Sequence, residues 1–303
     1  MTQTYDSNPL IAFSNAMADA VAKASGATVM VDARRRLPAS GIVFQTDLIL
    51  TADHVVEREE DLRIVLPDGG QRSASLVGRD AGTDLAVLHL DKPTAQTAEP
   101  AQEEARIGQL ALALGRPSPD GIQASLGVVS AVGGPVRTGR GGLLENYLRT
   151  DTIPYPGFSG GPLIDSGGFV LGLNTSGLSR GMSLTIPVSL AWSVARSLAE
   201  HGSVKRGYLG IRSQPVAIQA AQQKSLGREQ ANGLLIVWVE DASPAARGGL
   251  LVGDILIAIN GQPISDPDEL LASLVGQLVG QPTEVEVLRG GQPQTLSVTI
   301  GER

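Results

Sequence analysis

One serine stands in a stretch of chain that is suited to hold a nucleophile. Ser159 lies in the sequence PGFSGGP, residues 156–162. Three glycines around one serine permit a sharply turned backbone, which can aim successive N–H groups at one point, as the binding of an oxyanion requires. An ordinary Gly-Pro hairpin turn would use the same residues, so the motif alone leaves both interpretations open.

The chain has three histidines, and their settings differ. His54 follows the apolar run 48–52 and opens a helical turn at a strand-to-loop boundary, where catalytic side chains are often mounted. His89 alternates with apolar residues on a predicted strand, and His201 precedes a glycine at a predicted helix end, so structural or solvated roles are favoured for both. His54 is therefore the candidate general base, with a structural role still open on its position alone.

A carboxylate completes the set of candidates. Asp84 stands in GTDLAVLHL, at the mouth of a predicted buried strand, where a turn or capping role is the ordinary interpretation. Together, His54, Asp84 and Ser159 follow the chain order of the chymotrypsin-type catalytic triad. The blocks LTADHVV, GTDLAVL and GFSGGPLIDSGGFVLGLNTS resemble the three signature blocks of the bacterial HtrA (Deg) serine proteases, which have a trypsin-like barrel followed by PDZ domains.

This resemblance implies acyl transfer and a role for each candidate. Ser159 would attack the peptide carbonyl, His54 would take and return the proton, and Asp84 would fix the imidazole tautomer. The backbone N–H groups of Gly157 and Ser159 would form the oxyanion hole. The chain has neither an HExxH nor a GxxxxGK motif, and the mechanism calls for no metal or other cofactor.

Two residues depart from the family pattern. Phe158 stands where the family usually has asparagine, and a bulky residue there could bias the loop between a formed and a collapsed oxyanion hole. Asp53 replaces the usual alanine before His54. The favoured interpretation is that its side chain points to solvent; if it approached His54 instead, it would favour the protonated imidazole.

The specificity pocket is predicted partly by exclusion. Trypsin-type selection of basic side chains uses an acid six residues before the nucleophile, and here that position is Ile153, followed by the uncharged Pro154 and Tyr155. We therefore expect a small or medium apolar P1 residue, in agreement with what the resemblance implies. Asn174 and Thr175 are the candidates for the opposite pocket wall.

The elements that must position these residues are short strands. The chain has 37 glycines, 18 prolines and 3% aromatic residues, and short apolar runs separated by turn residues extend from Thr28 to about residue 175. We predict a mainly β fold, namely a trypsin-like double six-stranded β-barrel followed by a single α+β PDZ domain. The spacing predicts helices over 9–25, which forms an N-terminal segment, and over 188–202. The expected boundaries are 1–25, 26–200 for the protease domain, 201–207 for a linker and 208–303 for the PDZ domain.

In the second domain, one short motif and one helix are candidates for peptide binding. Tyr208, Leu209, Gly210 and Ile211 resemble the PDZ carboxylate-binding loop, which presents backbone N–H groups to a peptide C-terminus while the peptide adds a strand to the sheet. A helix over 267–279 would line the side-chain pocket through Leu271, Leu274 and Val275, which could equally be core residues.

Charge and composition limit the classes of partner and of chemistry that the chain can have. A net charge of −7 argues against the basic surface of a nucleic-acid binder, the absence of cysteine excludes disulfides and thiol catalysis, and no apolar run reaches the roughly 18 residues of a membrane span. Met1–Leu10 lacks the basic start of a secretory signal, so we expect the chain as written to be cytoplasmic, or periplasmic if its N-terminus was trimmed.

The resemblance also implies an ATP-independent endopeptidase acting on unfolded or misfolded proteins, a PDZ domain that binds peptides with apolar C-termini, and a homotrimer. Tyr5 and Phe13 are candidate aromatic residues for its interface. Two alternatives stay open. One is a proteolytically silent binding protein or chaperone; the other is a narrow regulatory protease gated by its PDZ ligand.

Overall fold

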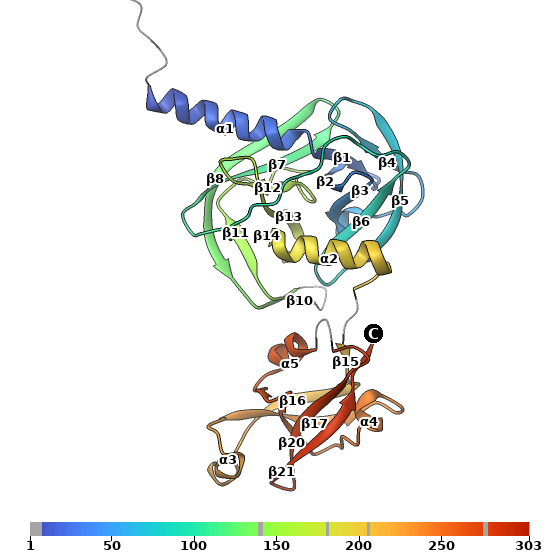
Figure 1. Cartoon of the computed structure of the whole chain (residues 1–303), viewed down its shortest axis with the longest axis vertical. Helices are drawn as coiled ribbons and strands as arrows, with labels where there is room; N and C mark the ends of the chain where they lie inside the picture. Colours follow the sequence, from blue (N-terminus) through green and yellow to red (C-terminus); the bar gives the residue numbers. More distant parts are fainter. Residues whose placement is uncertain (1–7, 139–141, 180–181, 205–206, 275–277, 303) are drawn as a thin grey trace, which may run out of the picture. The chain divides into compact units, whose positions relative to one another are not determined.

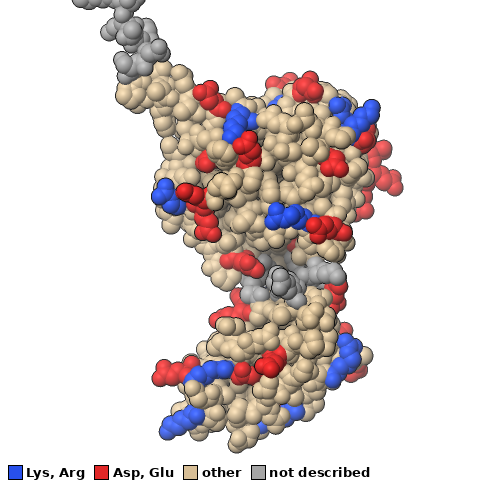
Figure 2. Space-filling model, viewed as in Figure 1, with Lys and Arg blue, Asp and Glu red and all other residues tan. Residues whose placement is uncertain are grey.

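The computed structural model describes residues 8–138, 142–179, 182–204, 207–274 and 278–302, and the chain forms two compact units, 1–204 and 205–303 (Figure 1). Tyr5, predicted at a trimer interface, lies outside the described residues. On the face shown in Figure 2, acidic and basic side chains are interspersed. Among the described residues, no helix is long and apolar enough to cross a membrane.

The first barrel closes in the order β1-β2-β3-β6-β5-β4, with every pair of neighbours antiparallel. Its strands are β1 (Thr28–Asp32), β2 (Ala39–Gln45), β3 (Leu48–Ala52), β4 (Leu62–Val65), β5 (Gln71–Asp80) and β6 (Leu85–Leu90). Small and branched aliphatic side chains such as Val29, Ile42 and Leu88 fill the interior and are fully buried. Because the chain has few aromatic residues, this core is built from valine, isoleucine and leucine side chains. Such side chains suit a pleated surface.

The second barrel closes in the order β11-β14-β13-β12-β7-β8. Its strands are β7 (Leu110–Ser118), β8 (Gly121–Gly133), β11 (Tyr147–Thr150), β12 (Pro162–Ile164), β13 (Val170–Ser179) and β14 (Met182–Pro187). Two closed six-stranded antiparallel barrels confirm the predicted fold class. Between β8 and β11, the short strands β9 (Val136–Arg137) and β10 (Leu143–Leu144) pair with each other.

Two helices of this unit begin and end where the sequence predicts. Helix α1 (Pro9–Ser25) is capped by the Asn8 side chain, which accepts a hydrogen bond from the N–H of Leu10. Helix α2 (Val188–His201) ends at Gly202, whose φ of 73° is the left-handed conformation that favours glycine. The apolar face of α2, including Ala191, Trp192 and Leu198, is buried in the main core of the unit.

The described part of the second unit contains a six-stranded sheet, a two-stranded sheet and three short helices. The strand order is β16-β17-β18-β20-β21, with β19 paired to β18, and β15 pairs with β22. The strands are β15 (Gly207–Tyr208), β16 (Ile211–Ala217), β17 (Asn232–Val239), β18 (Ile255–Ile259), β19 (Gln262–Pro263), β20 (Pro282–Arg289), β21 (Gln292–Thr299) and β22 (Gly301–Glu302), and the helices are α3 (Ala220–Leu226), α4 (Pro244–Arg247) and α5 (Pro267–Ser273). Helix α5 is shorter than the predicted 267–279, and Val275 lies outside the described residues. Strand β16 is at the edge of the sheet.

Candidate active site

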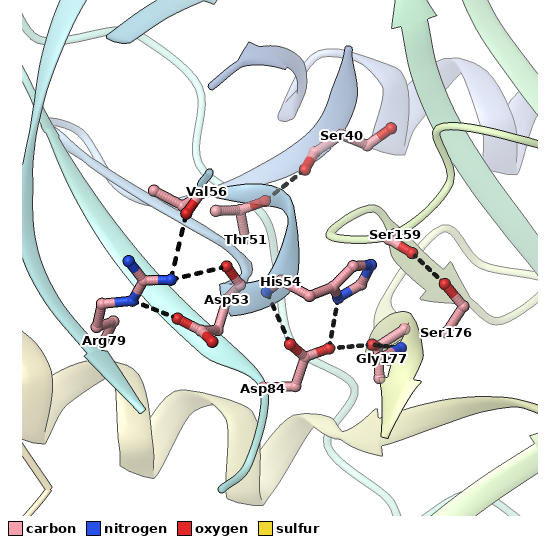
Figure 3. A network of polar contacts seen from close by, with 11 residues as sticks. Ser40, Thr51, Asp53, His54, Val56, Arg79, Asp84, Ser159, Ser176 and Gly177 are labelled. Atoms are coloured by element: carbon pink, nitrogen blue, oxygen red, sulfur yellow. Dashed lines mark hydrogen bonds and ion pairs between the residues drawn. The ribbon is translucent and has the colours of Figure 1, made fainter. Parts of the chain in front are cut away.

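His54 and Asp84 form a hydrogen-bonded pair between adjacent loops of the first barrel (Figure 3). His54 lies in the 3-10 turn η2 (Asp53–Val55) that follows β3, and Asp84 directly precedes β6 with a φ of 58°. His54 Nδ1 is 2.8 Å from Asp84 Oδ2, and the His54 backbone N–H donates to Asp84 Oδ1 over 2.9 Å. Asp84 therefore fixes both the ring and the backbone of His54.

The second barrel contributes two more residues to this pair. The Thr175 hydroxyl, from β13, donates a hydrogen bond to Asp84 Oδ2. Gly177 packs so closely that a Cβ on it would lie 2.5 Å from both Asp84 Oδ2 and His54 Nδ1. Asp84 is fully buried, and its carboxylate accepts hydrogen bonds from His54 and Thr175, which offset the cost of burying its charge.

Ser159 lies in the loop before β12, and a second serine holds that loop in place. The hydroxyl of the buried Ser40 donates to the Gly157 carbonyl over 2.7 Å and accepts from the Arg116 backbone N–H over 2.8 Å. The Ser40 backbone N–H donates to the Ser159 carbonyl over 3.1 Å. Among the described residues, the N–H groups of Gly157 and Ser159 donate to no protein acceptor, so they are available to an oxyanion.

The Ser159 hydroxyl forms its hydrogen bond with Ser176 and not with His54. Its Oγ is 3.1 Å from Ser176 Oγ. Figure 3 draws this contact between Ser159 and Ser176. No hydrogen bond joins Ser159 to His54 within the described part of the chain. The three candidate residues thus lie in one site, with His54 and Asp84 joined and the Ser159 hydroxyl turned to that of Ser176.

The prediction that Asp53 points to solvent is wrong. Its side chain is 1% exposed, and its carboxylate accepts a hydrogen bond from Arg79 Nε, on β5. Arg79 Nη2 also donates to the Asp53 carbonyl over 3.3 Å and to the Val56 carbonyl over 3.2 Å, as Figure 3 shows. One guanidinium therefore neutralises the buried acid and holds the turn that carries His54.

Phe158 is part of the core of the second barrel. Its side chain is 1% exposed and contacts Tyr155 edge to face, with ring centroids 5.4 Å apart. Its ring lies against Gly115, where a Cβ would come within 2.4 Å of it, and its backbone N–H donates to the Tyr155 carbonyl over 3.0 Å. The buried aromatic side chain thus anchors the loop.

A pocket of about 420 Å³ is lined by His54 and Ser159, whereas the fully buried Asp84 is not among its lining residues. Its lining residues come from both barrels and comprise Arg34, Arg36, Leu37, His54, Glu57, Pro154, Tyr155, Pro156, Gly157, Phe158, Ser159, Asn174, Thr175 and Ser176. The predicted wall residues Pro154, Asn174 and Thr175 are among them, but Ile153 is not, since its side chain is 57% exposed outside the pocket.

Sequence reasoning missed the charged residues Arg34, Arg36 and Glu57 in this lining; the run of three arginines at 34–36 was the available signal. Burial lowers the pKa of Arg34, and the charge of Glu57 opposes that shift.

In the second unit, the residues 208–211 form a turn that leads into β16. Gly210 has a φ of 80°, and a Cβ on it would lie 2.3 Å from Ser243 Cβ, so glycine is required. The Leu209 and Gly210 carbonyls accept hydrogen bonds from Ala245 and Glu240, and the Leu209 side chain is buried. Among the described residues, the N–H groups of Leu209 and Gly210, which precede β16, donate to no protein acceptor.

Comparisons with known proteins agree with this architecture. A trypsin-like peptidase domain model matches residues 39–173, and a PDZ domain model matches residues 207–300. A probable periplasmic serine endoprotease, DegP-like, of Halomonas elongata is 35% identical over 301 residues, covering 96% of this chain and 61% of that protein. A protein of the same name from Rhizobium meliloti is 35% identical over 88% of this chain and 54% of its own length. The chain thus spans about three fifths or less of these relatives.

Two solved structures are similar to this chain over nearly the whole length of both proteins. The HtrA-type protease AlgW with a decapeptide is 30% identical and covers 95% of this chain and 98% of its own, with a TM-score of 0.79. The serine endoprotease from Yersinia pestis is 31% identical over 95% of this chain and 98% of its own, with a TM-score of 0.77. Since both domains, their order and their folds agree, this chain belongs to the HtrA family of trypsin-like serine proteases with a PDZ domain.

Proposed function

We propose that the chain is an ATP-independent serine endopeptidase that works through an acyl-enzyme. The observation that carries this proposal is that one pocket is lined by His54, which is paired with Asp84, and by Gly157 and Ser159, whose N–H groups are unengaged among the described residues. A nucleophile, a base with an orienting acid, and two convergent donors are the groups that acyl transfer needs.

Each step uses a group of this chain. Because Asp84 engages His54 Nδ1, Nε2 is left to take the proton as Ser159 Oγ attacks the peptide carbonyl. The N–H groups of Gly157 and Ser159 bind the oxygen on which negative charge develops. His54 then gives the proton to the leaving amine, and water, activated by the same histidine, hydrolyses the ester to free Ser159.

The substrates proposed are unfolded or misfolded proteins cut after a small or medium apolar residue. The side of the pocket formed by Pro154, Tyr155, Asn174 and Thr175 carries no charge, which supports an apolar P1 side chain.

The PDZ domain is proposed to bind peptides with apolar C-termini. The three N–H groups of Leu209, Gly210 and Ile211 can receive a terminal carboxylate, and β16 has a free edge beside them. Helix α5 lies next to β16, so its partly exposed Leu271 can contact the last side chain of the peptide.

One observation favours a resting form of low activity. The Ser159 hydroxyl forms its hydrogen bond with Ser176, and it must leave that partner to give its proton to His54. This supports a protease gated by its PDZ ligand, in which peptide binding restores the bond between Ser159 and His54. Permanent silence is less favoured because the His54–Asp84 pair is fully formed.

Compartment and assembly are proposed from the relatives and from helix α1. The relatives are named periplasmic, which favours the cell envelope over the cytoplasmic placement expected from the N-terminal residues. Helix α1 exposes Leu10, Ile11 and Phe13, at 76%, 38% and 43%. An exposed apolar stripe of this kind supports a homotrimer interface.

Cleavage of unfolded casein tests the proposal directly. The chain and its Ser159→Ala variant would be compared with and without a peptide that ends in an apolar residue, and Ser130→Ala, an exposed serine on β8, would serve as a matched control. We expect the chain and the Ser130→Ala control to cleave casein, and the peptide to accelerate both reactions. We expect no cleavage by Ser159→Ala. Cleavage that persists in Ser159→Ala would refute the assignment, and no cleavage under any condition would favour the silent binding protein.

A further inference from the structure

The free edge of β16 is interrupted by a proline, and the hydrogen bonds of its neighbour show which way that proline faces. On β17, the Ile236 N–H donates to the Asp254 carbonyl, and the Ile236 carbonyl accepts from the Gly253 N–H. Ile236 therefore points its backbone groups away from β16. Since backbone direction alternates along a strand, Leu235 and Gly233 point theirs toward β16.

The register between the two strands then fixes the direction of every residue on β16. Leu235 is opposite Gln214 and Gly233 is opposite Val216, so these are the pairs that exchange hydrogen bonds. The Ile218 N–H, which donates to the Ala231 carbonyl, continues the same alternation. Ile211, Ser213, Pro215 and Ala217 therefore direct their backbone groups to the free edge.

Proline lacks an N–H, so the free edge has a gap in its donors. Ser213 offers both an N–H and a carbonyl, whereas Pro215 offers a carbonyl alone. The Pro215 side chain is exposed, and within the described residues no strand pairs with this edge. A peptide strand that extends along β16 thus finds an unbroken ladder only as far as Ser213.

A bound C-terminal peptide must run antiparallel to β16, because its carboxylate would sit at 209–211, where the strand begins. Its last residue would donate to the Ile211 carbonyl, and the residue two before it would exchange two hydrogen bonds with Ser213. The residue four before the last would face Pro215, where its own carbonyl has no donor. Peptide residues that lie further toward the peptide's N-terminus therefore cannot continue a regular ladder of hydrogen bonds with β16.

We infer that Pro215 limits recognition by the PDZ domain to about the last three or four residues of its peptide ligand. The inference rests on the proposed peptide binding at 208–211 and goes beyond it by naming the length of ligand that is read. Partners would be selected by a short apolar C-terminus, and the sequence before it would contribute little affinity.

The test measures affinity against peptide length, using the whole chain with Ser159→Ala so that no peptide is cut. The ligands share the same three apolar C-terminal residues and are extended with alanine to five and seven residues. We expect the three peptides to bind the Ser159→Ala chain within a factor of about two of one another. In a chain that also carries Pro215→Ala, the restored donor should tighten the five- and seven-residue peptides about 2- to 10-fold and leave the tripeptide unchanged.

A matched control separates the donor from a general effect of losing a proline. Pro263→Ala changes another exposed strand proline of the same unit, one that lies on β19 and away from β16, and should alter no affinity. The inference would be overturned if the affinity of the Ser159→Ala chain rose steadily with each extension of the peptide and Pro215→Ala had no effect on it. That result would leave peptide binding itself intact. Absence of binding by all peptides to every variant would overturn the underlying peptide-binding function as well.

Discussion

Ser40 offers a sharp test of how the nucleophile loop is held. Its buried hydroxyl satisfies the Gly157 carbonyl and the Arg116 N–H, and neither group has another partner to replace it among the described residues. Leaving a buried polar group unsatisfied costs about 1–3 kcal/mol. Two such groups are left in Ser40→Ala, which should therefore lower the free energy of unfolding by about 2–6 kcal/mol, measured by urea denaturation.

The same substitution should lower activity in the molecules that stay folded. The Gly157 carbonyl belongs to the peptide unit next to the proposed oxyanion donors, so releasing it loosens their alignment. Complete loss of one such donor costs about 10²–10³ in rate, and we expect a part of that loss, about 10- to 100-fold in kcat/KM for labelled casein. The Ser40 backbone N–H still donates to the Ser159 carbonyl in the variant.

The control is Ser130→Ala, because the exposed Ser130 hydroxyl also donates to a backbone carbonyl, that of Arg149, over 3.2 Å. It should change stability by less than about 0.5 kcal/mol and leave kcat/KM unchanged. An unchanged kcat/KM for Ser40→Ala, measured at a temperature where unfolding curves show it fully folded, would refute the idea that Ser40 positions the oxyanion donors.

Three other substitutions probe the residues around the triad. Ser176→Ala should raise casein cleavage without peptide about 2- to 10-fold, because Ser159 loses its competing partner; a fall in the rate with and without peptide would contradict this. Arg79→Gln should destabilise the chain by about 2–4 kcal/mol in urea, since it removes the guanidinium that neutralises the buried Asp53 carboxylate, and adding Asp53→Asn should recover most of the loss; no recovery would show that the pair does not act as a unit. Phe158→Asn should cost about 3–5 kcal/mol in thermal or urea unfolding, because it removes a fully buried ring; a stable variant would show that the loop is anchored by other residues.

Much of the fold could be predicted because its strands carry local signals. The run 48–52 is strand β3 from end to end, and α1 and α2 lie within a residue of their predicted ends, since Asn8 and Gly202 mark them. Strands β11, β12 and β14 were not among the predicted runs. They are short and follow loops that contain glycine, so pairing with other strands, among them β7 and β13, defines them.

The site shows the same division between local and distant information. His54, Asp84 and Ser159 stand in recognisable motifs, so their sequence neighbours were enough to select them. The roles of Ser40 and Arg79 depend on contacts with residues 117 and 26 positions away, which no local pattern records. For the same reason, Asp53 was expected in solvent, because its partner lies on a different strand of the barrel.

A fluorophosphonate probe tests the central proposal most directly, because it reacts with a serine only where the base and the oxyanion donors are assembled around it. We predict one adduct per chain after reaction in the presence of the activating peptide, located on Ser159 by mass spectrometry of the digested protein and abolished by His54→Ala. An adduct on another serine, or labelling of Ser159 that His54→Ala leaves unchanged, would contradict the assignment of His54 and Ser159 as base and nucleophile.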